Sequence, residues 1–241
     1  MFTKNLGSPE LKNILLIGGS RGLGAALRSE LSTNAIVNWT SRKPPENCIN
    51  LNENFLNLHQ TKSVETFATR LENLVFDQVI FCAAITDVGE STTEKPLGAD
   101  FHLDMFETIM QINCYAPLRI SQLLVAQGKL RPGAKLIFLS SKAGSIELRG
   151  KMQHHLPGGP SLYRISKAAL NCGVKNLAFD LKKAGITVVA VHPGWVRTNQ
   201  LNQSADTSAL FAAKELSLLF DKISKNDTGR FLDRKGGEIA W

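Results

Sequence analysis

Short runs of consecutive apolar residues alternate along the chain with longer segments in which apolar residues recur every three or four positions. The short runs predict strands buried on both faces, over residues 13–17, 35–39, 48–51, 79–85, 135–139, 186–191 and 229–232. The periodic segments predict helices after the first strand and over about 61–74, 100–127, 161–184 and 210–219. This alternation favours a single-domain α/β fold, a doubly wound parallel sheet of about seven strands with helices on both faces.

The first predicted strand leads into the first helix through a glycine-rich turn, Gly18-Gly-Ser-Arg-Gly-Leu-Gly24. A turn of this kind lets backbone N–H groups approach a phosphate, and the following helix adds the positive end of its dipole. The spacing G-x-x-x-G-x-G differs from the common dinucleotide fingerprint G-x-G-x-x-G, so a plain tight turn is the alternative interpretation. The strand before the turn and the helix after it favour a Rossmann-type nucleotide site.

The end of the second predicted strand bears on the choice of nucleotide. An acidic residue near this position usually holds the ribose 2′-hydroxyl of NAD, but here the first carboxylate downstream is Glu46. Arg42 lies there instead, and Arg21 lies within the glycine-rich turn. Each arginine alone would be taken as a solvated surface residue. Together they suit a 2′-phosphate, because a guanidinium group presents a planar fork of donors, so NADP(H) is predicted over NAD(H).

The helix predicted over 161–184 follows Pro160, and Ser161 is expected to cap it. Its inward stripe begins with Tyr163 and Lys167 and continues with purely apolar residues. Lysine is rarely buried without a partner, so this pair is a candidate for chemistry. Asn113 lies between apolar neighbours inside the helix predicted over 100–127, where asparagine has no propensity reason to be.

Composition and charge narrow the class of partner. The formal net charge of +7 suggests an anionic ligand, but the basic residues are dispersed and no nucleic-acid motif is present, so no nucleic-acid partner is expected. No apolar stretch is long enough to span a bilayer, and the N-terminus lacks a signal-peptide pattern. The cysteines show no CxxC spacing and are interpreted as small buried hydrophobes. We therefore expect a cytoplasmic protein without a membrane partner.

These motifs resemble those of the short-chain dehydrogenase/reductase family. The resemblance rests on G18-x-x-x-G22-x-G24, Asn113, Ser141, Y163-x-x-x-K167 and P193-G-x-x-x-T198, which occur in the family's order and span most of the chain. The segments around Ser141, Tyr163 and Pro193, together with the closing Gly-Gly-Glu-Ile-Ala-Trp, look like the C-factor and sniffer-type carbonyl reductase branch.

The resemblance implies a catalytic set of Asn113, Ser141, Tyr163 and Lys167. Tyr163 would be the general acid in carbonyl reduction and the base in the reverse direction, and Ser141 would hydrogen-bond the substrate carbonyl oxygen. Lys167 would bind the nicotinamide ribose, and Asn113 would hold a water in a relay to Lys167. We expect the Lys167 ammonium and the helix N-terminus to favour the tyrosine phenolate.

The NADP(H)-binding residues implied by the resemblance and the turn lie at the carboxyl ends of the predicted strands. They are Gly18, Ser20, Arg21, Gly22, Leu23, Gly24, Arg42, Asn57, Leu58, Ala83, Tyr163, Lys167, Pro193, Gly194, Val196 and Thr198. Residues 1–241 are thus expected to form one NADP-binding domain that also contains the catalytic site. The resemblance further implies a homodimer or homotetramer, whose interface could use Ala168, Ala169, Cys172 and Gly173, although internal packing of these residues is nearly as plausible.

The chain departs from the family pattern in three places. Phe81-Cys-Ala-Ala84 replaces the frequent Asn-Asn-Ala-Gly, and Asn57 stands where an aspartate is frequent. The 22 residues from Ser141 to Tyr163 are more than usual, and the extra segment 147–160 contains His154-His155. Without cysteine or carboxylate at ligand spacing this pair predicts a solvated loop and no metal site.

Two functions remain at this point. The first is an NADP(H)-dependent oxidoreductase that interconverts a small-molecule carbonyl compound and a secondary alcohol. The second is a signalling or regulatory protein that binds NADP without needing turnover. The complete catalytic set favours the enzyme. Trp195 either lines the substrate pocket or packs its own turn, and the polar segment 199–208 suits either a lid or an ordinary loop.

Overall fold

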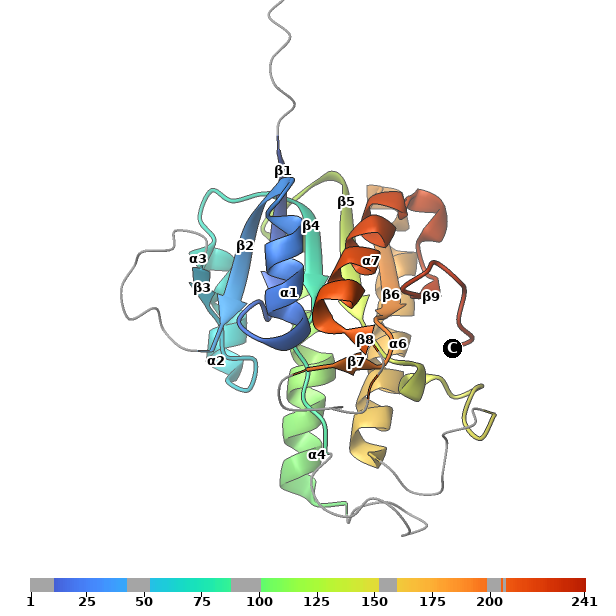
Figure 1. Ribbon diagram of the computed structural model, residues 1–241. Coiled ribbons are helices and arrows are strands. Elements are labelled where there is room, and N and C mark those ends of the chain that lie inside the picture. The colour runs from blue at the N-terminus through green and yellow to red at the C-terminus, as the bar shows by residue number, and fades with distance from the viewer. Residues whose placement is uncertain (1–10, 43–52, 88–100, 152–159, 199–204, 206) are drawn as a thin grey trace, which may run out of the picture.

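A computed structural model describes residues 11–42, 53–87, 101–151, 160–198, 205 and 207–241 (Figure 1). Its centre is a seven-stranded parallel sheet in the order β3-β2-β1-β4-β5-β6-β9. The strands are β1 (Lys12–Ile17), β2 (Ala35–Ser41), β3 (Glu53–Phe55), β4 (Phe76–Phe81), β5 (Leu130–Leu139), β6 (Thr187–His192) and β9 (Phe231–Asp233). A second, two-stranded sheet pairs β7 (Val196–Arg197) with β8 (Thr207–Ser208).

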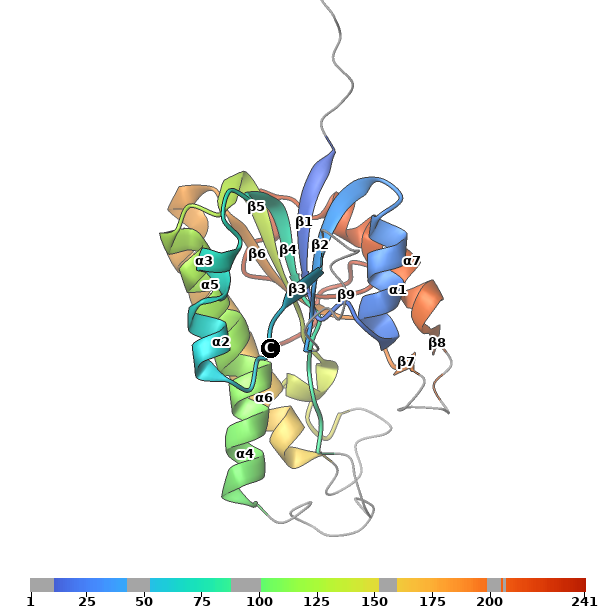
Figure 2. The ribbon, with the colours of Figure 1, turned by 90° about the vertical axis from the view of Figure 1, so that its left-hand side faces the viewer.

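Helices cover both faces of the large sheet (Figure 2). One face carries α1 (Gly22–Leu31) and α7 (Ala209–Lys222). The other carries α2 (Thr61–Glu65), α3 (Phe67–Arg70), α5 (Ala116–Ala126) and α6 (Ser161–Leu181). The helix α4 (Leu103–Met110) precedes α5, and a π-helical turn, η1 (Gln111–Tyr115), joins them. The short 3₁₀ turns are η2 (Lys142–Gly144), η3 (Lys182–Ala184) and η4 (Lys225–Asp227).

The apolar strand residues divide between two cores because side chains alternate along a strand. In β1, Leu15 and Ile17 pack into the core beneath α5 and α6, whereas Ile14 and Leu16 pack into the core beneath α1 and α7. All four side chains are at most 3% exposed, as the continuous apolar runs predict for a parallel sheet covered on both sides. The prediction of a single-domain, doubly wound Rossmann-type sheet is thus confirmed.

Several predicted boundaries are wrong. The helix predicted over 61–74 is broken at Thr66, whose hydroxyl donates to the Lys62 carbonyl (2.9 Å) between α2 and α3. The strand predicted over 79–85 ends at Phe81, because the chain leaves the sheet after Cys82 and Ala83 donate to the Ile17 carbonyl. The predicted strand 48–51 lies outside the described residues, and the β7–β8 pair was not predicted. None of the helices in the described ranges is both long and apolar enough to cross a membrane.

Candidate active site

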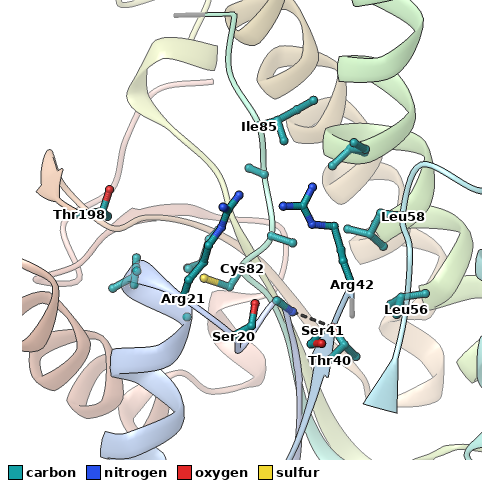
Figure 3. Close-up of a pocket in the computed structure, with 18 of the residues that line it drawn as sticks. Ser20, Arg21, Thr40, Ser41, Arg42, Leu56, Leu58, Cys82, Ile85 and Thr198 are labelled. Carbon is teal, nitrogen blue, oxygen red and sulfur yellow. Dashed lines mark hydrogen bonds between the residues drawn. The ribbon is translucent and has the colours of Figure 1, made fainter. Parts of the chain in front are cut away.

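A pocket of about 420 Å³ opens at the carboxyl ends of β1, β2, β4, β5 and β6, where the strand order reverses (Figure 3). Ligands of open α/β sheets bind at this edge, and the volume is that of a small-molecule site. Most of the predicted cofactor residues line it, namely Gly18, Ser20, Arg21, Gly22, Leu23, Gly24, Arg42, Asn57, Leu58, Ala83, Tyr163, Lys167, Pro193 and Thr198. Gly194 and Val196 do not line it. The lining also includes Cys82 and Ile85 from the segment after β4, which sequence reasoning did not assign.

The glycine-rich turn is packed so closely that side chains are excluded from it. A Cβ on Gly18, which has φ +94°, would lie 2.7 Å from the Ala83 Cβ, and a Cβ on Gly24 would lie 1.8 Å from the Gly18 carbonyl oxygen. Thr40 holds the turn against β2, since its hydroxyl accepts from Gly18 N (2.9 Å) and its carbonyl accepts from Gly19 N (3.1 Å). The turn therefore presents bare backbone and the start of α1 to the pocket, which fits a pyrophosphate.

Two guanidinium groups extend into the same part of this pocket (Figure 3). Arg21 is the N-cap residue of α1, whose N-terminus receives no side-chain cap, and Arg42 directly follows β2. None of the described residues that line the pocket is acidic. The chemistry of this donor set fits a 2′-phosphorylated dinucleotide better than one with a free 2′-hydroxyl.

Lys167 is buried at the edge of the core, as its place in the helical stripe indicates. Its side chain is 2% exposed, and its Nζ donates to the Leu139 carbonyl at the end of β5 (2.8 Å). The same Nζ lies 5.8 Å from the centroid of the Tyr163 ring. Burial lowers the pKa of Lys167 to about 8, and the neighbouring Cys82 and Cys114 thiols oppose this shift.

The expectation that Tyr163 favours its phenolate form is wrong for this structure. Burial of the side chain raises the pKa of Tyr163, because a phenolate loses hydration there. A hydrogen bond with the Ser141 side chain lowers the pKa again, but by less than burial raises it. Tyr163 is thus a protonated phenol at neutral pH, held beside the Ser141 hydroxyl.

Ser141 follows β5 and starts the turn η2. Its Oγ accepts from Ala143 N (3.1 Å), which fixes the side chain at the start of this turn. The Nδ1 of His192, at the end of β6, accepts from Lys142 N (3.4 Å). Burial and the nearby cations Lys142 and Arg234 lower the pKa of His192 to about 4, so the imidazole is neutral and its Nδ1 is free to accept. The ends of β5 and β6 are thereby joined beneath the site.

Asn113 is 1% exposed and lies in the π-helical turn η1. Its Oδ1 accepts from Ile85 N (2.9 Å), and its Nδ2 donates to the Ile85 carbonyl (2.8 Å) and to the Ser166 hydroxyl (3.0 Å). Both amide hydrogens are therefore used to tie the segment after β4 to α6. This is the observed role of the side chain, and it accounts for an asparagine between apolar neighbours.

Two polar residues that support the site were missed from the sequence. Ser161 does not cap α6. Instead, the Asp87 carboxylate accepts from Leu162 N (3.0 Å) and Tyr163 N (3.2 Å), and so caps the helix from another element. Asn171 lies on α6 one turn beyond Lys167, and its side-chain oxygen accepts from the Ser140 hydroxyl (2.5 Å). No local pattern reveals either partner, because each pair is more than 30 residues apart in the chain.

The remaining predicted features divide between described and undescribed parts of the chain. Thr198 lines the pocket beside the start of α1, and its Cγ2 is 3.4 Å from the place of a Cβ on Gly22. Trp195 is 53% exposed and is not among the residues that line the pocket, so the choice between its two predicted roles stays open. Gly173 is used internally, because a Cβ there would lie 2.4 Å from Leu118 on α5. The pair His154-His155 and most of 199–208 lie outside the described residues.

A protein-family profile described as "Enoyl-(Acyl carrier protein) reductase" matches residues 56–229. The chain belongs to the short-chain dehydrogenase/reductase family. Among curated members of this family, the C-signal of Myxococcus xanthus is 32% identical over 160 residues, which cover 65% of this chain and 90% of the relative. An uncharacterised oxidoreductase of Saccharomyces cerevisiae is 30% identical over 255 aligned positions, covering 92% of this chain and 95% of the relative.

Solved structures of short-chain dehydrogenases/reductases share the fold over nearly the whole chain. A member from Burkholderia multivorans with bound NADP aligns with a TM-score of 0.80 and 26% identity, over 96% of this chain and 100% of that one. An NADPH-bound carbonyl reductase from chicken fatty liver aligns with a TM-score of 0.78 and 25% identity over the same shares. The carbonyl reductase Sniffer of D. melanogaster, at 22% identity and a TM-score of 0.77, shows the fold. The predicted resemblance to the family is confirmed, with a likeness in sequence to the C-signal and a likeness in fold to Sniffer.

Proposed function

We propose that this protein is an NADP(H)-dependent oxidoreductase that interconverts a carbonyl compound and a secondary alcohol, with Tyr163 as the general acid/base. The observation that carries this proposal is the group of Tyr163, Ser141 and Lys167 at the carboxyl edge of the sheet. The Tyr163 side chain hydrogen-bonds with Ser141, and the buried Lys167 amine lies on the same face of α6. Membership of an oxidoreductase family and the NADP-bound structural neighbours support it.

In this proposal each part of NADP(H) is held by a different group of residues. The backbone of 18–24 and the N-terminus of α1 bind the pyrophosphate. Arg21 and Arg42 bind the 2′-phosphate, while Asn57 and Leu58 border the adenine. Lys167 binds the nicotinamide ribose, and the segment from Pro193 to Thr198 orients the carboxamide. The cofactor, when bound, supplies or accepts the hydride.

The protein side of the reaction is proton transfer at one substrate oxygen. During reduction the Tyr163 hydroxyl donates its proton to the carbonyl oxygen as that oxygen gains negative charge, and the Ser141 hydroxyl donates a hydrogen bond to the same atom. In the oxidation direction the Tyr163 phenolate accepts the alcohol proton. Asn113 acts as a positioning residue, because its side chain fixes Ile85 against α6.

The protonation state of Tyr163 favours reduction at neutral pH. Its raised pKa keeps the phenol protonated, which is the form needed to donate a proton to a carbonyl oxygen. Oxidation needs the phenolate, so its rate should rise as the pH approaches and passes ~10, the ordinary pKa of tyrosine.

The alternative is a regulatory NADP-binding protein, which the likeness to the C-signal of Myxococcus xanthus brings to mind. A pure binder needs no proton donor, however, and an apolar side chain in place of the buried Lys167 would serve the fold at lower cost. The enzyme is therefore the proposed function.

The test is turnover of NADPH with a panel of ketones, aldehydes and quinones, followed by absorbance at 340 nm. We expect the wild-type protein to oxidise NADPH, and Tyr163→Phe to lower kcat by about 10²- to 10⁴-fold, because the proton donor is lost. NADPH affinity, measured by fluorescence titration, should be nearly unchanged in this variant. Tight NADPH binding by the wild type without turnover on any substrate would favour the regulatory function instead.

We also propose that the protein forms homo-oligomers in the cytoplasm. The outward face of α6 carries Ile165, Cys172 and Phe179 at intervals of seven residues, and all three are exposed, Phe179 by 83%. A second copy that packs on this stripe would cover it. The described cysteines Cys82, Cys114 and Cys172 are free thiols, which suits a reducing compartment.

A further inference from the structure

The chain after β9 turns back and docks against the segment that carries Ser141. Asp233 forms the turn, because its Oδ1 accepts from Lys235 N (2.9 Å) and Gly237 N (3.0 Å). Ile239 N then donates to the Phe231 carbonyl (2.7 Å), and the Ile239 side chain is 5% exposed. In Figures 1 and 2 the C mark lies beside the short turn that follows β5.

Trp241 is held in place from two sides. Its ring stacks on Phe231 of β9 with 5.4 Å between the ring centroids. Lys175 of α6 lies over the same ring, with its Nζ 5.4 Å from the centroid, and this Nζ also donates to the Gly229 carbonyl (2.8 Å). The indole therefore joins the strand β9 to the helix that carries Tyr163 and Lys167.

The main-chain oxygens at 240–241 bind the segment after Ser141. The Ser145 hydroxyl, on a residue that is 3% exposed, shares its hydrogen between Ala240 O (2.7 Å) and Trp241 O (3.2 Å). The same hydroxyl accepts from Leu148 N (3.2 Å), and Glu147 N donates to Trp241 O (3.1 Å). The tail thus supplies acceptors to the buried Ser145 hydroxyl and to the main-chain N–H of Glu147.

The held stretch is directly continuous with the site. Between Ser141 and Ser145 the chain forms η2, in which Gly144 N donates to the Ser141 carbonyl (2.9 Å). Gly144 lies against α6 so closely that a Cβ there would be 2.7 Å from the backbone carbon of Lys167. A shift of Ser145 would therefore move η2 relative to Lys167 and change the direction of the Ser141 side chain.

We propose that Ser145 and Trp241 are positioning residues, which hold the segment 141–148 so that the Ser141 hydroxyl stays beside the Tyr163 hydroxyl. Neither residue lines the cofactor pocket. Their loss should therefore lower kcat without changing NADPH binding. The kinetic part of this inference rests on the proposed carbonyl chemistry, whereas the structural coupling does not.

The test compares Ser145→Ala and Trp241→Ala with Ile223→Ala. Ile223 is 3% exposed in the core beneath α1 and α7, so its truncation destabilises the fold without touching the tail. We expect the first two variants to lower kcat by about tenfold, because sub-ångström displacement of a catalytic group is costly, with an unchanged KM for NADPH. Trp241→Phe keeps a ring on Phe231 and the main-chain oxygen, and should retain most of the wild-type kcat.

Hydrogen–deuterium exchange of the same variants separates this inference from the proposed function. Peptides covering 141–148 should exchange faster in Ser145→Ala and Trp241→Ala than in the wild type, and at the wild-type rate in Ile223→Ala. Equal exchange in all four proteins would overturn the coupling. Faster exchange with an unchanged kcat would overturn the positioning role. A wild type without turnover would refute the carbonyl chemistry, and exchange alone would then decide the coupling.

Discussion

The burial of Lys167 lowers the stability of the fold. A lysine that is 2% exposed loses most of its hydration, and the single carbonyl acceptor on Leu139 does not restore it. The pKa of about 8 expresses this cost, since the folded protein releases the lysine proton far more easily than the unfolded chain does. Lys167 lines the pocket, so a role in ligand binding would account for a lysine at this position.

The lowered pKa of Lys167 predicts how the stability of the protein depends on pH. Between the folded pKa of about 8 and the ordinary 10.5, the unfolded chain binds the proton and the folded protein does not, so the Lys167 contribution to stability rises with pH through this window. The full difference between the two pKa values corresponds to a change of about 3 kcal/mol in the free energy of unfolding. Urea unfolding of wild type and Lys167→Met from pH 7 to 10.5 measures it. A constant difference between the two proteins across this range would contradict the depressed pKa.

The arginine pair makes a second prediction at this scale. Replacing Arg42 by aspartate removes a donor for the 2′-phosphate and places a carboxylate where NAD-binding proteins use one. We expect Arg42→Asp to weaken NADPH binding by about tenfold or more and to leave NADH binding equal or improved. Arg28→Asp is the control. Arg28 is on α1, where its guanidinium group lies over the ring of Trp39, and it does not line the pocket. Unchanged NADPH affinity in Arg42→Asp would disprove the assignment.

At the scale of elements, the site depends on how α6 begins. Its first residues follow Pro160, and its cap comes from Asp87 after β4. The same segment is tied to η1 through Ile85 and Asn113. Two hydrogen-bonded contacts thus set the start of α6, and hence Tyr163, relative to the carboxyl end of β4.

Removal of this cap should affect both stability and catalysis. Asp87→Ala leaves the N–H groups of Leu162 and Tyr163 without their acceptor, which should cost about 1 kcal/mol of unfolding free energy. It should also lower kcat, because the first turn of α6 carries Tyr163. Asp87→Asn keeps one acceptor oxygen and should lie between the alanine variant and the wild type. If the two variants lose the same stability, the charge of Asp87 and not its hydrogen bonds stabilises the helix.

At the scale of the whole molecule, the parallel sheet brings distant segments to one edge. Ser141, Tyr163 and Arg21 are far apart in the chain, yet each follows a strand or starts a helix at the carboxyl ends of the strands. The face of α6 opposite the pocket carries the exposed stripe of Ile165, Cys172 and Phe179. The proposed catalytic site and the proposed oligomer interface therefore lie on opposite faces of the same helix.

The stripe predicts an assembly that one substitution can break. Wild-type protein should have the mass of a dimer or tetramer in size-exclusion chromatography with light scattering. Phe179→Asp should shift it toward the monomer, because an unpaired carboxylate would be buried in the interface. Phe211→Asp, on the exposed side of α7, is the matched control and should keep the wild-type mass if α6 forms the contact. A monomeric wild type would refute the proposal.

The sequence by itself determined the layers of the fold and the polar residues worth attention. Short continuous apolar runs that alternate with periodic segments predict strands covered on both faces, and a lysine and an asparagine stand out among their apolar neighbours. It also determined the glycine-rich turn, whose close contact with Ala83 and the Gly18 carbonyl leaves no room for side chains. These signals are local, so they can be read without a structure.

Only the tertiary structure decided how these residues are held. Asp87 accepts from the main-chain N–H of Leu162, 75 residues later in the chain. The Asn113 amide hydrogen-bonds with Ile85 and Ser166, and Trp241 contacts the segment after Ser141. The direction of the Tyr163 pKa shift also reversed, because burial outweighs the favourable neighbours that a helical spacing reveals. Desolvation and long-range hydrogen bonds depend on what surrounds a side chain in space, and no spacing along the chain contains that information.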